Sequence, residues 1–162
     1  MKKLLVLLFA IFAFSTAKSQ TLVSVDGQVG LMASIQTQQY TVGVPIWFSE
    51  SISFIPHLGF YSEEDIGTEL GLGGALRFHF REDEIKPYAG FRLAVENTSP
   101  DEGDSTMDLL IGGVFGGEYF FNNNFSAGVE AQLNIINPDD HSPQYNGLTI
   151  HTEAAVYMAV YF

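Results

Sequence analysis

Residues 106–135 read TMDLLIGGVFGGEYFFNNNFSAGVEAQLNI. Every second residue from Met107 to Phe121 and from Phe125 to Ile135 is apolar, aromatic or glycine, and Glu118 lies among the residues in between. A period of two residues is typical of a strand with one apolar face, and three asparagines in a row favour a tight turn. The stretch therefore predicts a β-hairpin.

The same period extends on both sides of this hairpin and predicts eight strands. They cover Leu22–Met32, Gln39–Phe48, Ile52–Tyr61, Thr68–Phe80, Lys86–Glu96, Thr106–Phe121, Phe125–Ile135 and Thr149–Phe162. Short turns at 49–51, 81–85 and 122–124 alternate with longer loops at 33–38, 62–67, 97–105 and 137–148. All the longer loops then lie at one end of the sheet, as in outer-membrane barrels.

Glycine and charge decide which face of these strands points inward. The apolar face carries no charge, whereas the opposite face carries charged residues and nine of the sixteen glycines, at 30, 43, 59, 71, 73, 90, 112, 116 and 128. Space is scarce inside an eight-stranded barrel, so the glycine-rich face points inward, and an apolar exterior of this extent needs lipid. We expect an all-β, eight-stranded antiparallel up-and-down transmembrane β-barrel rather than a soluble, lipocalin-like one.

Length and composition narrow the class of protein. The chain has 162 residues, a formal net charge of −12 and no cysteine. This length suits one domain, and the acidic balance argues against nucleic-acid binding, which needs Lys and Arg on phosphates. The lack of cysteine excludes disulfides and thiolate metal sites.

The N-terminus has the pattern of a secretory signal. Lys2 and Lys3 precede an apolar run, Leu4–Phe14, and small residues follow at Ala17 and Ser19. Eleven apolar residues would span only about 16 Å as a helix, against a hydrocarbon core of about 30 Å. We therefore expect residues 1–19 to be a cleaved signal peptide and residues 20–162 to form the barrel.

Two features of the strand ends agree with a membrane barrel. Aromatic residues gather at the short-turn end, as in the interfacial girdles of such barrels: Phe48, Phe54, Phe78, Phe80, Tyr119, Phe121, Phe125 and Phe162. The chain also ends on Phe162, with Val160 and Met158 at alternate positions before it. This ending resembles the C-terminal signal that the outer-membrane insertion machinery reads.

With these features, the chain resembles the small outer-membrane barrel family of the OmpA transmembrane-domain and opacity-protein type. The resemblance is most specific over residues 112–130 and at the C-terminus, and it extends in pattern over residues 20–162. It implies residence in the outer membrane of a Gram-negative bacterium, with the bilayer, lipopolysaccharide and the insertion machinery as partners. Family members include structural proteins, adhesion or evasion proteins and narrow channels, so the resemblance leaves the role open.

The inward face carries the candidate site, a polar network in the lumen. Counted from the short turns, Arg77 and Arg92 fall at a depth similar to Glu118, Glu130 and Glu153. Buried charges persist only when they are paired and hydrogen-bonded. We expect an Arg–Glu network that fills the lumen, and the alternative interpretation is a gate for small ions.

Acidic clusters occur on three of the longer loops, at Glu63–Asp65, Asp101–Asp104 and Asp139–Asp140. Their oxygens suit Ca²⁺ or Mg²⁺, but the spacing of a calcium-binding loop is missing, so we expect no metal site and no cofactor. The clusters could serve instead as a surface for an unknown ligand.

The histidines offer no convincing catalytic pair. His151 and Glu153 share the inward face, but no serine with triad spacing accompanies them, and nucleophilic catalysis needs a nucleophile and a base within hydrogen-bond reach. The expected function is a structural or surface-interaction role without enzyme activity. The alternatives are a narrow gated pore and an enzyme that modifies lipid A.

Overall fold

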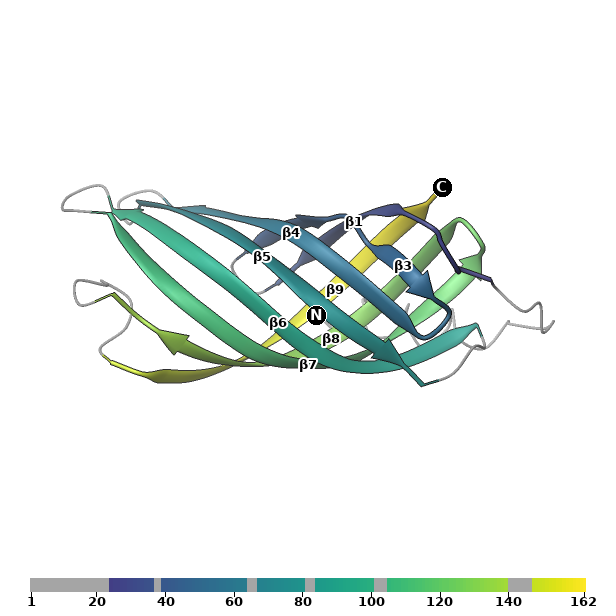
Figure 1. The fold of residues 1–162 in the computed structure, drawn as a ribbon. Coiled ribbons are helices and arrows are strands. Elements are labelled where there is room, and N and C mark those ends of the chain that lie inside the picture. Colours follow the sequence, from purple (N-terminus) through teal and green to yellow (C-terminus); the bar gives the residue numbers. More distant parts are fainter. Residues whose placement is uncertain (1–23, 37–38, 64–66, 81–83, 101–104, 140–146) are drawn as a thin grey trace, which may run out of the picture.

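Figure 1 shows the computed structural model, which describes residues 24–36, 39–63, 67–80, 84–100, 105–139 and 147–162. Within them the chain forms one sheet of β1 (Gly30–Ile35), β2 (Tyr40–Gly43), β3 (Ile46–Ser49), β4 (Ile52–Glu63), β5 (Gly67–His79), β6 (Ile85–Pro100), β7 (Thr106–Asn122), β8 (Phe125–Asn137) and β9 (Thr149–Tyr161). No helix in this described part is long and apolar enough to cross a membrane.

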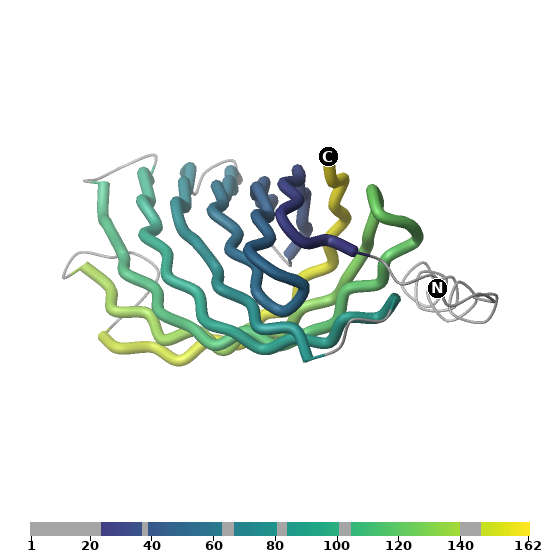
Figure 2. The backbone as a smooth tube through the Cα atoms, turned by 45° about the vertical axis from the view of Figure 1, so that its right-hand side comes forward, coloured from purple at the N-terminus to yellow at the C-terminus, as the bar shows by residue number. Residues whose placement is uncertain are grey.

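The sheet closes into a barrel with eight strand positions, because β2 and β3 are two parts of one strand. β2 pairs with β1 on one side and β4 on the other, and β3 continues along β4. β9 pairs with β8 and with β1, which closes the circle (Figure 2, with the yellow C-terminal strand beside the purple start of the described chain). All pairs are antiparallel, so the structure confirms the predicted eight-stranded up-and-down barrel.

The bounds of the first predicted strand, Leu22–Met32, are wrong, because β1 covers Gly30–Ile35. Before β1, the Gln28 N–H donates to the Val25 carbonyl at 3.1 Å and closes a turn. Gly27 in this turn has a φ of 72°, a left-handed conformation that glycine adopts without the steric cost of a Cβ. The Asp26-Gly27 pair is a turn signal that the apolar alternation around it hid.

The second predicted strand, Gln39–Phe48, is interrupted at Val44 and Pro45. Proline has no N–H to give to a strand ladder, and the Pro45 carbonyl accepts instead from the Gly30 N–H at 2.8 Å. The interruption does not change which face points inward. Thr41 and Trp47 on either side of it are both buried.

The register of the strand pairs fixes the tilt of the strands. We follow the paired residue from each strand to the next around the barrel, starting at Met107 of β7. The path returns to β7 at Gly117, ten residues further along the strand, after passing through Asn97, Leu70, Phe60, Tyr40, Ile35, Val156 and Val129. With about 3.3 Å per residue along a strand and about 4.8 Å between strands, this shift tilts the strands by about 40°. Membrane barrels have tilts of this size.

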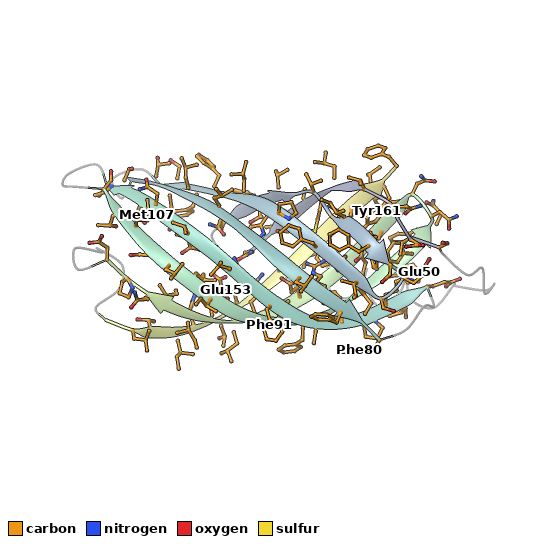
Figure 3. The ribbon with its side chains drawn as sticks, viewed as in Figure 1. Glu50, Phe80, Phe91, Met107, Glu153 and Tyr161 are labelled. Carbon is orange, nitrogen blue, oxygen red and sulfur yellow. The ribbon has the colours of Figure 1, made fainter. Side chains whose placement is uncertain are left out.

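Exposure agrees with the predicted polarity of the wall. Leu72, Val129 and Val156 are exposed by 65%, 61% and 58%, whereas Arg77 and Glu130 are exposed by 4% and 7%. Apolar side chains therefore point away from the barrel on all sides, and the charged ones fill it (Figure 3).

Aromatic rings surround the short-turn end of the barrel. Phe48, Phe80 and Phe162 are exposed there, the rings of Phe121 and Phe125 stack with centroids 5.2 Å apart, and Tyr119 meets Phe121 edge to face at 4.9 Å. Such a belt is typical of one membrane interface, and the end that carries it is on the right in Figure 1.

Candidate functional site in the barrel lumen

A chain of ion pairs and hydrogen bonds crosses the middle of the lumen. Arg77 Nη2 lies 2.6 Å from Glu130 Oε2, and Gln132 Nε2 donates to Glu130 Oε1 at 2.8 Å. Arg92 Nη1 donates to Gln132 Oε1 and lies 3.9 Å from Glu153 Oε2. The structure thus brings together four of the five residues named from the sequence, through a glutamine.

Arg77 lies between two tyrosine rings. Its guanidinium carbon is 4.4 Å from the ring centroid of Tyr88 and 4.7 Å from that of Tyr157. The Tyr88 hydroxyl donates to Glu130 Oε2 at 2.9 Å. A buried ion pair is stable when other hydrogen bonds satisfy its remaining polar atoms, and Glu130 accepts from Arg77, Tyr88 and Gln132. The Arg77–Glu130 pair is therefore a well-supported centre of the lumen.

Glu118, the fifth expected member, departs from the predicted Arg–Glu pairing. Its carboxylate accepts hydrogen bonds from the hydroxyls of Ser126 at 2.5 Å, Tyr161 at 2.6 Å and Tyr157 at 3.4 Å. Within the described chain no arginine forms an ion pair with it. The reason is depth: the register places Glu118 opposite Lys86 of β6, nearer the short turns than either arginine.

Glycines make room for the large inward side chains. Each lies directly across a strand pair from one of them: Gly116 from Tyr88, Gly128 from Tyr157, Gly30 from Tyr161, Gly90 from Arg77 and Gly112 from Arg92. A Cβ on Gly128 would lie 2.3 Å from Tyr157 Cζ, and one on Gly30 would lie 2.7 Å from Tyr161 Cδ1. At Gly30, Gly116 and Gly128 a tyrosine ring therefore occupies the space that a Cβ would need.

Residues 24–28, which we call the N-terminal latch, close the short-turn end of the lumen. Glu50 Oε1 accepts hydrogen bonds from Ser24 Oγ at 2.7 Å and from the Val25 N–H at 3.0 Å. Glu50 Oε2 accepts from Lys86 Nζ at 3.0 Å, and Lys86 is fully buried. Figure 3 labels Glu50 at this end. One carboxylate thus holds both the latch and a buried ammonium group.

Below the latch the lumen is packed with apolar and aromatic side chains. Val25 is fully buried in one cluster with Trp47, Phe120 and Tyr161. The Lys86 ammonium lies 5.7 Å from the Trp47 ring centroid and 5.8 Å from that of Phe120. The short-turn half of the lumen is therefore filled.

The latch shifts the titration of Glu50. Burial raises the pKa of this carboxyl, but the hydrogen bonds from Ser24 and Lys86, together with the charge of Lys86, lower it more, and the pKa lies below its ordinary value. The latch contacts therefore favour the ionised carboxylate.

A small polar cavity lies in the middle of the lumen, lined by Arg77, Arg92, Glu130, Gln36, Thr41 and His57 among others. The cavity volume that the centre of a water molecule can reach is about 30 Å³, which is enough for about two water molecules. Gln36 Oε1, Thr41 Oγ1 and Arg77 Nε are buried without a hydrogen-bond partner among the described residues. Buried polar groups are nearly always hydrogen-bonded, so these three atoms are the groups that a small polar molecule in the cavity would contact.

The long-loop half of the lumen is acidic. Glu69, Glu96, Asp108 and Glu153 project inward from four strands, with Arg92 as the counter-charge below them. Gln39 Nε2 donates to Glu69 at 3.2 Å, passing over Gly59. The described residues contain no group of three His, Asp or Glu side chains that could hold a metal ion.

The inward histidines have separate surroundings. His79 Nε2 lies 3.0 Å from Ser53 Oγ, and both residues are buried. His57 Nδ1 lies 3.3 Å from the Ile55 carbonyl. His151 is half exposed, with Nδ1 3.7 Å from Glu153 Oε1. The three do not form one site.

Sequence reasoning missed the short-turn half of the lumen. Trp47, Lys86 and Tyr88 lie at inward-facing positions of their strands, and the two-residue alternation of the sequence was sufficient to place them inside. Glu50 lies in a short turn, and only the curvature of the sheet across β4, β5 and β6 brings it to Lys86. Most of the acidic loops fall on residues 64–66, 101–104 and 140–146, which lie outside the described residues, as does the expected signal peptide.

Comparison with known proteins adds two solved barrels. The N-terminal β-barrel domain of Pseudomonas aeruginosa OprF matches with a TM-score of 0.62 and 18% identity, over 85% of this chain and 98% of that one. Neisserial surface protein A (NspA) matches with a TM-score of 0.60 and 15% identity, over 83% of this chain and 95% of that one. No protein-family model and no curated protein matches the sequence. The chain therefore has the fold of the small eight-stranded outer-membrane β-barrels.

Proposed function

We propose that this protein is an integral outer-membrane β-barrel with a filled lumen, which holds its long loops at the cell surface in a structural or interaction role. One observation carries the proposal: apolar side chains point outward on all sides of the barrel, and the charged ones are buried inside it. A soluble barrel could not leave so much apolar surface in water, whereas lipid requires it. The shared fold with two outer-membrane barrels supports the same placement.

The lipid-facing wall has a discriminating test at Phe91, which is 68% exposed near mid-height of the apolar band (Figure 3). In a bilayer, Phe91→Arg should destabilise the folded barrel by about 2–4 kcal/mol, and Phe91→Leu should have little effect. Urea unfolding in vesicles measures both. If Phe91→Arg were neutral or stabilising, the wall would face water and the proposal would fail.

A narrow pore is the second candidate, and the central cavity beside Arg77 and Glu130 is the observation that favours it. We propose a closed lumen instead, because the latch and the aromatic cluster fill the short-turn half. Planar-bilayer recordings separate the two. The closed lumen predicts no steady conductance, and single-channel steps from the folded protein would favour the pore.

The proposal assigns no reaction to the barrel. Ser53 and His79 come within hydrogen-bond distance, but His79 Nδ1 has no partner among the described residues that could orient the ring. A catalytic serine needs a base that is itself positioned and a path for the substrate. Mass spectrometry of lipid A from cells with and without the protein tests this point, and a mass shift would overturn it.

A further inference from the structure

The hairpin of β1 and β2 is held by shorter ladders than the other strands. Within the described chain, the ladder of β9 with β1 ends at the pair Val156–Ile35, although β9 begins at Thr149. The ladder of β4 with β2 ends at Phe60–Tyr40, although β4 continues to Glu63. Contacts other than backbone pairing therefore matter more for this hairpin than for the strands from β4 to β9.

Two polar side chains of the hairpin line the central cavity. They are Gln36, directly after β1, and Thr41 of β2. Gln36 Oε1 and Thr41 Oγ1 are both buried without a hydrogen-bond partner among the described residues. A buried polar group without a hydrogen bond destabilises the folded state. An occupant of the cavity that bonds both atoms would therefore stabilise the hairpin.

Arg77 of β5 brings a third atom to the same cavity. Its Nε is buried without a partner among the described residues, while its Nη2 pairs with Glu130 at 2.6 Å and its guanidinium lies between the rings of Tyr88 and Tyr157. An occupant that accepts from Nε would therefore connect the hairpin with the Arg77–Glu130 ion pair.

The three atoms require an occupant that both donates and accepts hydrogen bonds. The Arg77 Nε–H only donates, the Gln36 carbonyl oxygen only accepts, and the Thr41 hydroxyl does both. An ion is not needed to balance charge, because Arg77 pairs with Glu130 and Arg92 lies 3.9 Å from Glu153. The cavity volume of about 30 Å³ leaves room for no more than about two water molecules.

We propose that the cavity binds about two water molecules, which bridge Gln36 and Thr41 of the hairpin to Arg77. This water bridge ties the part of the barrel with the shortest ladders to the central ion pair. The inference goes beyond the role proposed above and does not depend on it, because the site lies inside the lumen whichever medium surrounds the wall. Phe91→Arg tests the membrane placement separately.

A double-mutant cycle tests the water bridge. Thr41→Val and Gln36→Met each remove one bridging group and nearly keep its shape. Amide hydrogen exchange of the β1–β2 hairpin in detergent micelles measures how often the hairpin opens. Each single variant should raise the opening equilibrium constant by about tenfold, because the water and its other partners lose a hydrogen bond. Since both groups bind the same water molecules, the double variant should also stay near tenfold, well below the product of about a hundredfold.

Thr106→Val is the matched control for the cycle. Thr106 Oγ1 is also buried without a partner among the described residues, but Thr106 is not one of the residues that line the cavity. This variant should leave the exchange of the hairpin unchanged, both alone and when added to Gln36→Met. If Thr41→Val or Gln36→Met slowed the exchange or left it unchanged, the cavity would be dry and the proposal would fail. A double variant near a hundredfold would show that the two groups act independently, which would also overturn the shared bridge.

An exchange of salts tests the identity of the occupant. Urea unfolding of the wild-type protein should give the same unfolding constant in sodium chloride, sodium gluconate and potassium gluconate at equal ionic strength. A ligand that binds only the folded state stabilises it in proportion to its occupancy. Stabilisation by chloride or by one of the two cations that is lost in Thr41→Val would therefore show an ion in place of water, and would overturn the proposal.

Discussion

The two halves of the lumen are built from the same two-residue alternation, yet they differ in kind. In the short-turn half, rings fill the space left by glycines, and charges such as Lys86 and Glu118 are fully enclosed. In the long-loop half, carboxylates dominate, Glu153 keeps 26% of its side chain exposed, and the ladders of β1 and β2 with their neighbours are short. The comparison teaches that the short-turn half holds the fold through enclosed rings and charges, whereas the long-loop half leaves its Arg92–Glu153 ion pair part-exposed.

The largest expected effect is in the middle of the lumen. Arg77→Ala leaves Glu130 buried without its counter-charge, which should cost about 3–5 kcal/mol of unfolding free energy. Arg92→Ala should cost clearly less, because its ion pair with Glu153 is long and part-exposed. Urea unfolding in vesicles compares the two. Equal losses would mean that the two halves are equally dependent on their charges.

A double variant sharpens this result. Arg77→Met with Glu130→Leu removes both charges, and it should recover most of the stability lost in Arg77→Ala, because well-packed apolar residues often replace a buried ion pair without loss.

A smaller effect is expected from filling the space that the rings occupy. Gly128→Ala forces a Cβ against Tyr157 and should cost about 1–3 kcal/mol. Gly117→Ala is the matched control, since nothing lies within 4 Å of its Cβ, and it should stay within about 0.5 kcal/mol. Thermal unfolding in detergent measures both, and equal melting temperatures would contradict the packing described here.

The contacts of Glu50 with the N-terminal latch should weaken at low pH, and the effect should be seen locally at Trp47. Because the pKa of Glu50 is lowered in the folded protein, its contribution is present above the ordinary carboxyl value of about 4.3 and is lost as the pH falls through the folded value. Acrylamide quenching of Trp47 should therefore be low at pH 7 and rise only once the pH has fallen below the ordinary carboxyl value. Glu50→Gln should show raised quenching at pH 7 and little change with pH, and a wild-type pH profile in that variant would contradict the latch.

The smallest effect is expected at Glu153. Its ion pair with Arg92 is 3.9 Å long and part-exposed, so Glu153→Gln should change the unfolding free energy by no more than about 0.5 kcal/mol. Urea unfolding beside Arg77→Ala checks this. A loss as large as that of Arg77→Ala would remove the distinction between the two halves.

Much of the fold could be predicted from the sequence, because alternation reports directly on the two faces of a strand. Glycine sharing a face with Arg77 and Glu130 indicated the inside, and exposure agrees at both residues. The bounds of the first strand were wrong for a local reason. The apolar alternation continues across Asp26-Gly27, where the chain turns, and so resembles a strand.

The site was less predictable, because it depends on depth as well as on face. Parity places Glu118 inside, but only the register shift around the barrel shows that it meets Tyr161 instead of an arginine. The short ladders of β1 and β2 depend on the length of one hairpin relative to the six other strands of the barrel, and no single stretch of sequence contains that comparison.

The short hairpin also decides where the barrel is weakest. The ladder between β9 and β1 has six residue pairs and that between β2 and β4 has four, whereas those from β4 to β9 have at least twelve each. Amide protons in these two short ladders should exchange first, and the barrel should open there before any other pair of strands separates.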